Sequence, residues 1–448
     1  PVLQRKQIFQ SDIVQYTGMA KEQIDFRAAT DIEPYWTNSA FGGMPTYQLG
    51  AKYPHDYIGA LDDVLRFLPR PADYLFLYFL GFYGLLLVLK IDPLKAFFGA
   101  IAFGFSTYLI IILGVGHNAK AHAIGYMPLV IAGFLLVFQK KYVWGGLLTL
   151  FATALEINAN HFQMTYYLLI FLLVLVGYFT YQFIKVKDYK GLGIALGSLA
   201  VAGIFAIGAN ATNLLATTEY TKFSTRGKGE LTFTADGSKV TENTALSRDY
   251  ITEYSYGIAE SFNLVAPRLF GGSNNETLGT ESSMYQFMIS QGVPAAQVED
   301  YVKGMPTYWG DQPIVAAPAY IGAVVFFLAF LALLIDKRRI KYVFFGGAMI
   351  ALVLSWGKNL PTVTDFFIDY IPLYDKFRAV SSIQVLLELC FPVLAVMGLQ
   401  SFFQLDQIQQ KKALLQSTLF GVGVMLILFV FKGTFNFSAA SDDYFIKN

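Results

Sequence analysis

Cysteine and charge are both scarce in this sequence. A single cysteine, Cys390, occurs in 448 residues, so a disulfide within the chain and a cysteine-based zinc site are both excluded. Charged residues make up 15% of the chain, against about 25% in a soluble globular protein. The formal net charge is +1, so we expect no nucleic-acid partner bound through bulk charge.

Several familiar signatures are also missing. The sequence has no Walker-type phosphate loop, no GxGxxG after a strand, no HExxH and no GxSxG. Nucleotide-driven chemistry and common hydrolase mechanisms are therefore disfavoured. The chain starts at Pro1 and shows no charged segment followed by an apolar one, as a signal peptide would. We expect a first membrane helix to precede Pro1 in the complete protein.

Hydrophobic residues, by contrast, make up 55% of the chain, and aromatic residues 16%. A helix needs about 20 predominantly apolar residues to cross a bilayer. Ten segments are candidates: 73–90, 96–113, 122–138, 142–157, 164–184, 191–211, 314–335, 342–355, 383–403 and 413–431. We therefore predict an all-α, polytopic transmembrane protein, in which the lipid bilayer is the first partner.

Lys and Arg set the predicted orientation of this bundle. The five connections that follow the odd-numbered spans are short and hold thirteen Lys or Arg, whereas the short connections on the other side hold four. Positive residues favour the cytoplasmic side. We therefore predict a bacterial inner membrane protein whose N-terminal segment, long loop and C-terminus face the periplasm.

This topology divides the chain into five parts. They are a first extracytoplasmic loop (1–72), a six-helix transmembrane block (73–211), a long extracytoplasmic loop (212–313), a four-helix block (314–431) and an extracytoplasmic tail (432–448). In the first part, Ser11 is placed to cap a helix from Asp12 to about Ala28, and a second amphipathic helix is expected over 57–68. Residues 224–245 of the long loop are expected to be flexible.

Reactive side chains gather on the predicted outer side, which carries all four histidines of the sequence. His117 and His122 are five residues apart, a poor spacing for two metal ligands on one helix face. Lys120 could snorkel to the interface or meet a lipid phosphate. Asp12 could interact with a helix dipole or act as a catalytic acid or base. Glu388, inside a span, suggests either a functional group or a buried structural hydrogen bond.

The chemistry available to these groups is a transfer at the membrane surface. A sugar on a membrane-embedded phosphate carrier would react outside the cell, where its leaving phosphate needs cations and the acceptor hydroxyl needs a carboxylate base. A divalent cation, Mg²⁺ or Mn²⁺, could share the charge of a diphosphate. The assignments are Asp12, then Glu219, as base; Lys120, Arg378, Arg226, His117 and His122 at the donor phosphate; and Tyr308, Trp309 and Asp311 at the acceptor. Tyr308 and Trp309 could instead be interface aromatics.

Short motifs in a fixed order give the sequence a family resemblance. They are Gln10 to Tyr16, Trp36 to Pro45, Gly116 to Ala121, Tyr308 to Pro313 and the pair Phe377-Arg378. Together they resemble the YfhO family, and the stretch from Val265 to Ser273 resembles the form found in Bacteroidota. The chain departs from the family pattern by lacking a first span and by ending soon after its last one.

The resemblance implies membership of the C-type (GT-C) glycosyltransferase superfamily. Such enzymes use polyprenyl-phosphate or polyprenyl-diphosphate sugars, and their catalytic carboxylate lies in the first extracytoplasmic loop, where Asp12 stands. The expected function is transfer to an exported protein, as in O-glycosylation by an oligosaccharyltransferase, or to a polymer of the cell envelope. The alternative is non-enzymatic: a flippase for lipid-linked sugars, or a scaffold subunit of an envelope or secretion complex.

Overall fold

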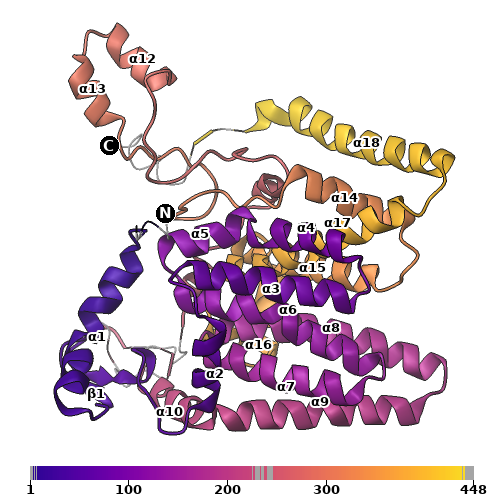
Figure 1. Cartoon of the computed structure of the whole chain (residues 1–448). Coiled ribbons are helices and arrows are strands. Elements are labelled where there is room, and N and C mark those ends of the chain that lie inside the picture. Colours follow the sequence, from indigo (N-terminus) through magenta and orange to yellow (C-terminus); the bar gives the residue numbers. More distant parts are fainter. Residues whose placement is uncertain are drawn as a thin grey trace.

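The protein is mostly helical. A computed structural model describes residues 4, 6, 8–224, 226–227, 233, 237–239, 246–435 and 437–438. The helices of its main bundle (Figure 1) are α3 (Ala72–Val88), α4 (Pro93–Gly104), α5 (Thr107–Val115), α6 (Asn118–Phe138), α7 (Tyr142–Asn158), α8 (Phe162–Lys185), α9 (Tyr189–Ala209), α14 (Ala323–Ile335), α15 (Lys341–Ser355), α17 (Val385–Phe402) and α18 (Gln407–Val430).

Several of these helices are long and apolar enough to cross a membrane. Within the described residues there are five such helices, or six if α4 and α5, which meet at a bend of 49°, form one span. Helices α3, α14 and α15 are apolar but shorter. The chain is thus an all-α, multi-pass membrane protein, although fewer helices reach the spanning length than the ten predicted from sequence.

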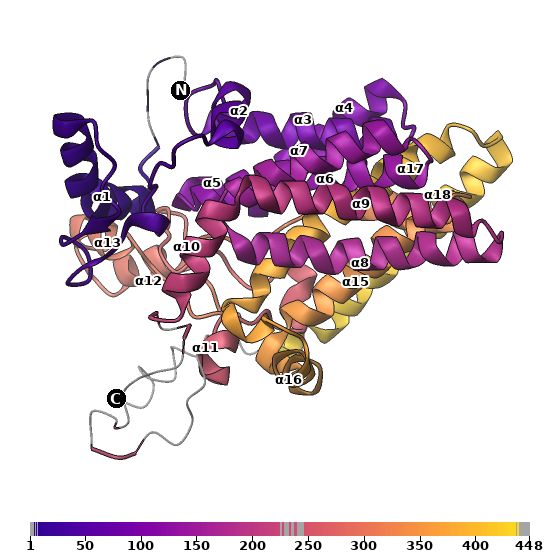
Figure 2. The same ribbon diagram turned by 90° about the horizontal axis from the view of Figure 1, so that it is seen from below.

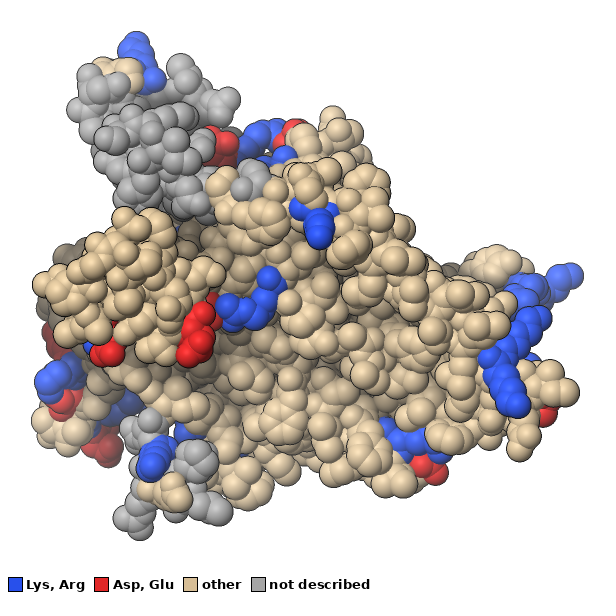
Figure 3. Space-filling model, turned by 90° about the horizontal axis from the view of Figure 1, so that it is seen from above, with Lys and Arg blue, Asp and Glu red and all other residues tan. Residues whose placement is uncertain are grey.

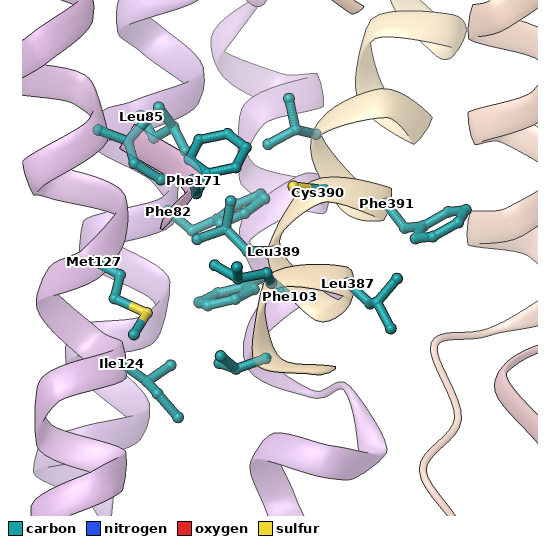
Figure 4. Packing of buried hydrophobic residues seen from close by; sticks show 14 of the residues in the cluster. Phe82, Leu85, Phe103, Ile124, Met127, Phe171, Leu387, Leu389, Cys390 and Phe391 are labelled. Atoms are coloured by element: carbon teal, nitrogen blue, oxygen red, sulfur yellow. The ribbon is translucent and has the colours of Figure 1, made fainter. Parts of the chain in front are cut away.

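Helix α17 forms the centre of the bundle. Every residue from Val385 to Gly398 is buried, and α17 packs against α14, α15 and α4. Figure 4 shows buried side chains of α17 in one cluster with side chains of α3, α4, α6 and α8. The rings of Phe82 and Phe103, for example, stack with centroids 4.5 Å apart. A helix that is apolar all round is expected at such a position, because it has no polar face to turn outward.

Two predicted spans are irregular where they reach one end of the bundle. The span predicted over 314–335 becomes helical only at Ala323, because Pro318 and the positive φ of Gly322 (113°) interrupt the segment before it. The other predicted span, 96–113, breaks between α4 and α5. The two irregular segments touch, since the Thr107 amide donates to the Tyr320 carbonyl at 3.3 Å.

The N-terminal segment lies at this same end of the bundle (Figures 1 and 2). It contains α1 (Ser11–Thr30), a small antiparallel pair of β1 (Trp36–Thr37) with β2 (Met44–Pro45), η2 (Thr46–Gln48) and α2 (Tyr57–Leu65). The predicted cap of α1 was wrong: Ser11 is already helical, and Gln10 is the N-cap without a side-chain bond. Helix α2 is capped by Asp56, whose carboxylate accepts from the Gly59 amide at 2.8 Å.

The connection from 212 to 313 is more structured than its polar composition predicts. It contains α10 (Ala211–Thr221), α11 (Arg248–Thr252), η3 (Ala259–Leu264), α12 (Ser283–Ser290) and α13 (Ala295–Tyr301). Nearby lie η4 (Gly357–Asn359), α16 (Pro361–Tyr370), η5 (Tyr374–Lys376) and η6 (Val380–Gln384), and η7 (Phe431–Thr434) follows α18. Most of the segment 224–245, predicted to be flexible, and most of the tail 432–448 lie outside the described residues.

The two ends of the bundle therefore differ in build. The N-terminal segment and the long connection cover one end, and short turns make the other (Figure 2). On the face drawn in Figure 3, Lys and Arg side chains mark the right-hand end, and charged side chains are sparse over the broad region beside it. The elaborated end holds the groups that sequence analysis assigned to function.

Candidate functional site

A cavity of about 900 Å³ opens at the elaborated end of the bundle. Its walls come from α1, from the turns that lead into α6 and α8, from η6 and from the long connection. Six of the ten assigned residues line it: Asp12, His117, Lys120, His122, Arg226 and Arg378. Residues more than 360 positions apart in sequence thus share one cavity.

Asp12 and His117 form a close pair on its wall. Asp12 Oδ2 lies 3.1 Å from His117 Nε2. The first turn of α1 packs directly on Gly116, which has a φ of 91°, and a Cβ there would approach Gln10 Cβ to 2.9 Å. Gln10 also donates to the Leu113 carbonyl at 2.6 Å. Burial, and then the charge of Lys120, lower the pKa of His117 below its usual 6.5, so the imidazole is neutral at pH 7 and can accept a proton.

Lys120, one turn into the same wall, has no carboxylate partner. Its half-buried Nζ donates to Ser382 Oγ at 3.2 Å, and no ion pair involves it within the described residues. Lys120 occupies the first turn of α6, where the helix dipole disfavours a cation. An anion bound in the cavity would pair with the Lys120 ammonium and offset its unfavourable interaction with the helix dipole.

Three arginines line the same cavity, and each contacts a neutral group of the protein. Arg378 Nη1 donates to Tyr250 Oη at 2.6 Å, and its guanidinium lies 5.1 Å from the centre of that ring. Arg226 Nε donates to the Lys376 carbonyl at 3.0 Å. Arg70 lies over the Tyr74 ring, 5.8 Å from its centre. Asp375, three residues before Arg378, pairs with Lys376 at 2.7 Å.

None of the four cations forms an ion pair with a described carboxylate. The two acids of the lining are Asp12 and Glu260. Glu260 is already held by donors of the protein, including Tyr308 Oη at 2.6 Å and the Gly257 amide at 3.0 Å. The cavity therefore has a surplus of positive charge, and a low-dielectric wall concentrates such a field.

Another wall of the cavity is apolar. Ile111, Ile112 and Val115 of α5 line the cavity beside the irregular segment 314–319. Non-helical backbone at membrane depth is tolerated where it is buried in protein or lines a cavity. The site thus combines cations with an aliphatic surface, which is the character of an amphiphilic anion's binding site.

His122 lies in a separate polar network at the cavity edge. Its Nε2 is 2.5 Å from Asp62 Oδ1, which also accepts from Tyr126 Oη at 2.7 Å. Arg66 bridges Asp62 at 2.6 Å and Asp73 at 3.2 Å. These bonds outweigh burial and lower the pKa of Asp62 to about 2. The network ties α2 to α6, so the Nε2 of His122 is engaged by protein.

The other assigned residues lie outside the large cavity. Glu219 is exposed on α10. Tyr308 is buried and braces Glu260, whereas the Trp309 ring stacks on Phe270 with centroids 4.2 Å apart. Asp311 lines a second cavity of about 380 Å³. The acceptor assignment of Tyr308, Trp309 and Asp311 stays a prediction.

Few side chains of the site could bind a metal ion. Among the residues that the structure describes, no group of three or more His, Cys, Asp or Glu side chains could hold a metal ion. Asp12 and His117 offer two donors, so Mg²⁺ or Mn²⁺ at this pair would need its other ligands from a bound anion or water.

Sequence reasoning missed several polar lining residues, among them Arg70, Tyr256, Glu260 and Gln384. Arg70 had a readable signal, since it is a cation just before a span on the cation-poor side. The other three became recognisable only through contacts between distant segments. Searches against protein-family models, curated proteins and solved structures found no match to this chain.

Proposed function

We propose that this protein is a membrane glycosyltransferase of the GT-C type, resembling the YfhO family. It would move a sugar or oligosaccharide from a polyprenyl phosphate or diphosphate to a hydroxyl acceptor. The observation that carries the proposal is the cavity itself, where four cations that form no ion pair with a described carboxylate lie beside an aliphatic wall. A lipid phosphate has the matching two parts, an anionic head and a hydrocarbon chain.

The reaction follows from the groups around Asp12. The acceptor oxygen attacks the anomeric carbon as the bond from that carbon to the carrier phosphate breaks. The acceptor's proton goes to Asp12 or, through the contact of Asp12 with its imidazole, to neutral His117. Lys120 and Arg378 stabilise the negative charge that grows on the leaving phosphate. Attack opposite the leaving group would invert the anomeric configuration.

The acceptor is either an exported protein or a glycopolymer of the envelope. The structured connection between 212 and 313 lies next to the cavity and supplies part of its wall. That position suits a clamp on an acceptor chain. A flippase or an envelope scaffold is the competing function, in which the cavity would bind a lipid-linked sugar without transferring it.

The proposed site faces the periplasm of a bacterial inner membrane, because its end of the bundle is opposite to the turns rich in Lys and Arg. We expect a cysteine at Ser290, exposed on α12, to react with a membrane-impermeant thiol reagent in whole cells. A cysteine at Lys141 should react only after lysis, and the wild type, with buried Cys390 alone, is the blank. The reverse labelling pattern would invert the orientation.

The function is tested by mass spectrometry of envelope glycans and glycoproteins from a deletion strain. We expect one glycan to be lost, and to be restored by the wild type and by Arg268→Gln. Arg268 is an ion-paired control outside the cavity, 2.8 Å from Glu276. Lys120→Gln and Asp12→Asn, at equal protein level, should fail to restore it. An unchanged glycan profile in the deletion strain would refute transfer, and restoration by Asp12→Asn would favour a flippase or scaffold.

A further inference from the structure

Some buried polar atoms of the cavity lining have no hydrogen-bond partner among the residues that the structure describes. Tyr256 Oη and Gln384 Oε1 are buried and make no hydrogen bond to any described residue. Tyr256 is 1% exposed and Gln384 is 5% exposed. Leaving a buried polar atom unpaired costs about 1–3 kcal/mol, and native structures contain few such atoms. A polar ligand or ordered water would supply the partners that the described residues do not.

These two side chains come from segments that are tied together. The Ser381 amide donates to the Tyr254 carbonyl at 3.0 Å, and this bond joins the segment before Tyr256 to η6. The Tyr256 amide in turn donates to the Ser355 carbonyl at 2.8 Å. Both backbones are thus held, and the unpaired atoms are properties of a fixed structure rather than of a loose loop.

A further buried polar residue, Glu388, follows Gln384 on α17. Gln384 is the N-cap of α17, and Glu388 lies one turn further along that helix. Both carboxylate oxygens of Glu388 are buried without a hydrogen bond to a described residue. Sequence analysis left Glu388 as either functional or a structural hydrogen-bonding group, and the buried hydroxyl of Ser106 lies beside it as a structural partner.

The chemistry of these atoms differs from that of the cationic wall. A phenol hydroxyl donates and accepts, and an amide oxygen accepts. Neutral groups of this kind recognise hydroxyls, whereas Lys120 and the arginines recognise an anion. Tyr74, Tyr108, Tyr254 and Tyr256 add aromatic rings to the same lining.

We infer that Tyr256 and Gln384 form a subsite for a polyhydroxylated group, the sugar carried by the donor, whose hydroxyls would pair with Tyr256 Oη and Gln384 Oε1. This inference rests on the proposed function, since it divides the cavity into a phosphate part and a sugar part. It assigns Tyr256 and Gln384 as specificity-determining residues.

The test uses the full-length chain in lipid nanodiscs and two probes. One is a polyprenyl diphosphate, and the other is the same lipid carrying glucose, mannose, galactose or N-acetylglucosamine. We expect at least one sugar to increase the affinity over the bare lipid. Tyr256→Phe should reduce that gain by about 3- to 10-fold, the worth of one neutral hydrogen bond, and leave the affinity for the bare lipid unchanged.

Tyr78→Phe is the matched control. Tyr78 Oη is also buried and unpaired within the described residues, but Tyr78 lies in the hydrophobic core and does not line the cavity. Both substitutions remove an unpaired hydroxyl, so both should leave the thermal midpoint unchanged or raise it. Only Tyr256→Phe should alter sugar recognition, a pattern that a structural role of the hydroxyl would not produce.

The outcomes separate the two proposals. If the bare lipid binds and no sugar adds affinity, or if Tyr256→Phe leaves the gain intact, water fills the subsite and the inference is wrong. If neither lipid binds the wild type, the proposed donor site itself fails. A lower thermal midpoint for Tyr256→Phe would show that its hydroxyl has a protein partner, which would also overturn the inference.

Discussion

Lys341 and Lys120 occupy equivalent positions at opposite ends of the bundle, and their surroundings differ. Each lies in the first turn of an apolar helix, α15 and α6 respectively, where the helix dipole disfavours a cation. Lys341 Nζ donates to three carbonyls, of Ala332, Leu333 and Asp336, at 3.2, 2.7 and 2.6 Å. Lys120 donates to one hydroxyl, of Ser382. The donors of Lys341 are used within the fold, whereas Lys120 keeps donors that can bind a ligand in the cavity.

The same contrast extends to neighbouring cations. Arg338, near Lys341, binds Asp336 at 2.6 Å, and bonds from Arg338 and from Ser401 hold the pKa of that carboxyl below its usual value in spite of burial. Arg378, across the cavity wall from Lys120, meets a tyrosine instead of a carboxylate. Arg338 is thus neutralised by a carboxylate of the protein, whereas no described carboxylate forms an ion pair with Arg378.

The largest expected effect concerns the proposed base. Asp12→Asn should reduce sugar transfer by at least about 100-fold, the lower end of general-base contributions, while the protein stays folded and inserted. Glu219→Gln is the control, because Glu219 is exposed and does not line the cavity. The measurement is the transfer rate of each variant in membranes, which shows whether Asp12 or Glu219 acts as the base. A severe loss in Glu219→Gln with a normal rate in Asp12→Asn would exchange their roles.

Substitution of Lys341 and of Lys120 is expected to change the free energy of unfolding differently. Lys341→Met should lower the free energy of unfolding by about 1–3 kcal/mol, because three carbonyls lose a charged donor. Lys120→Met should leave stability unchanged or raise it, since it removes a half-buried charge without a carboxylate partner. Thermal unfolding in detergent measures both. Equal destabilisation by the two substitutions would remove the distinction between a structural and a binding lysine.

A pH dependence of stability is expected from His161, the N-cap of α8 in the cavity wall. Burial, and next the charge of Lys120, lower the pKa of His161 from 6.5 to about 3. The unfolded chain then binds a proton below pH 6.5 that the folded chain does not bind until about pH 3. Stability should be complete above pH 6.5 and fall between these values. His161→Gln should flatten that slope in thermal unfolding, and an unchanged slope would exclude His161 as its source.

The sequence was sufficient for those features that depend on local pattern. Apolar runs predicted helices near their observed positions, and the cation-poor side led to Asp12, Lys120 and Arg378, which line one cavity. The helix expected to start at 314 was wrong, because Pro318 and Gly322 were weighed less than apolar composition. Ser11 was wrong as a cap because Gln10 anchors the turn through Leu113, a residue 103 positions away.

Long-range partners explain what the sequence could not predict. Tyr256 and Gln384 have ordinary sequence surroundings, and their unpaired atoms become visible only where their two segments meet. A cavity is a property of contacts between segments, so its neutral polar lining has no sequence motif.

The cations of the cavity are proposed to hold a lipid phosphate, and an affinity comparison can test this. The full-length protein in nanodiscs is titrated with a polyprenyl phosphate and with the uncharged polyprenol of the same chain length. A hydrogen bond to a charged group contributes about 1.5–3 kcal/mol, so the phosphate should increase affinity at least about 10-fold, and Lys120→Gln should remove most of that increase. Equal affinities for the phosphate and the alcohol would contradict the account.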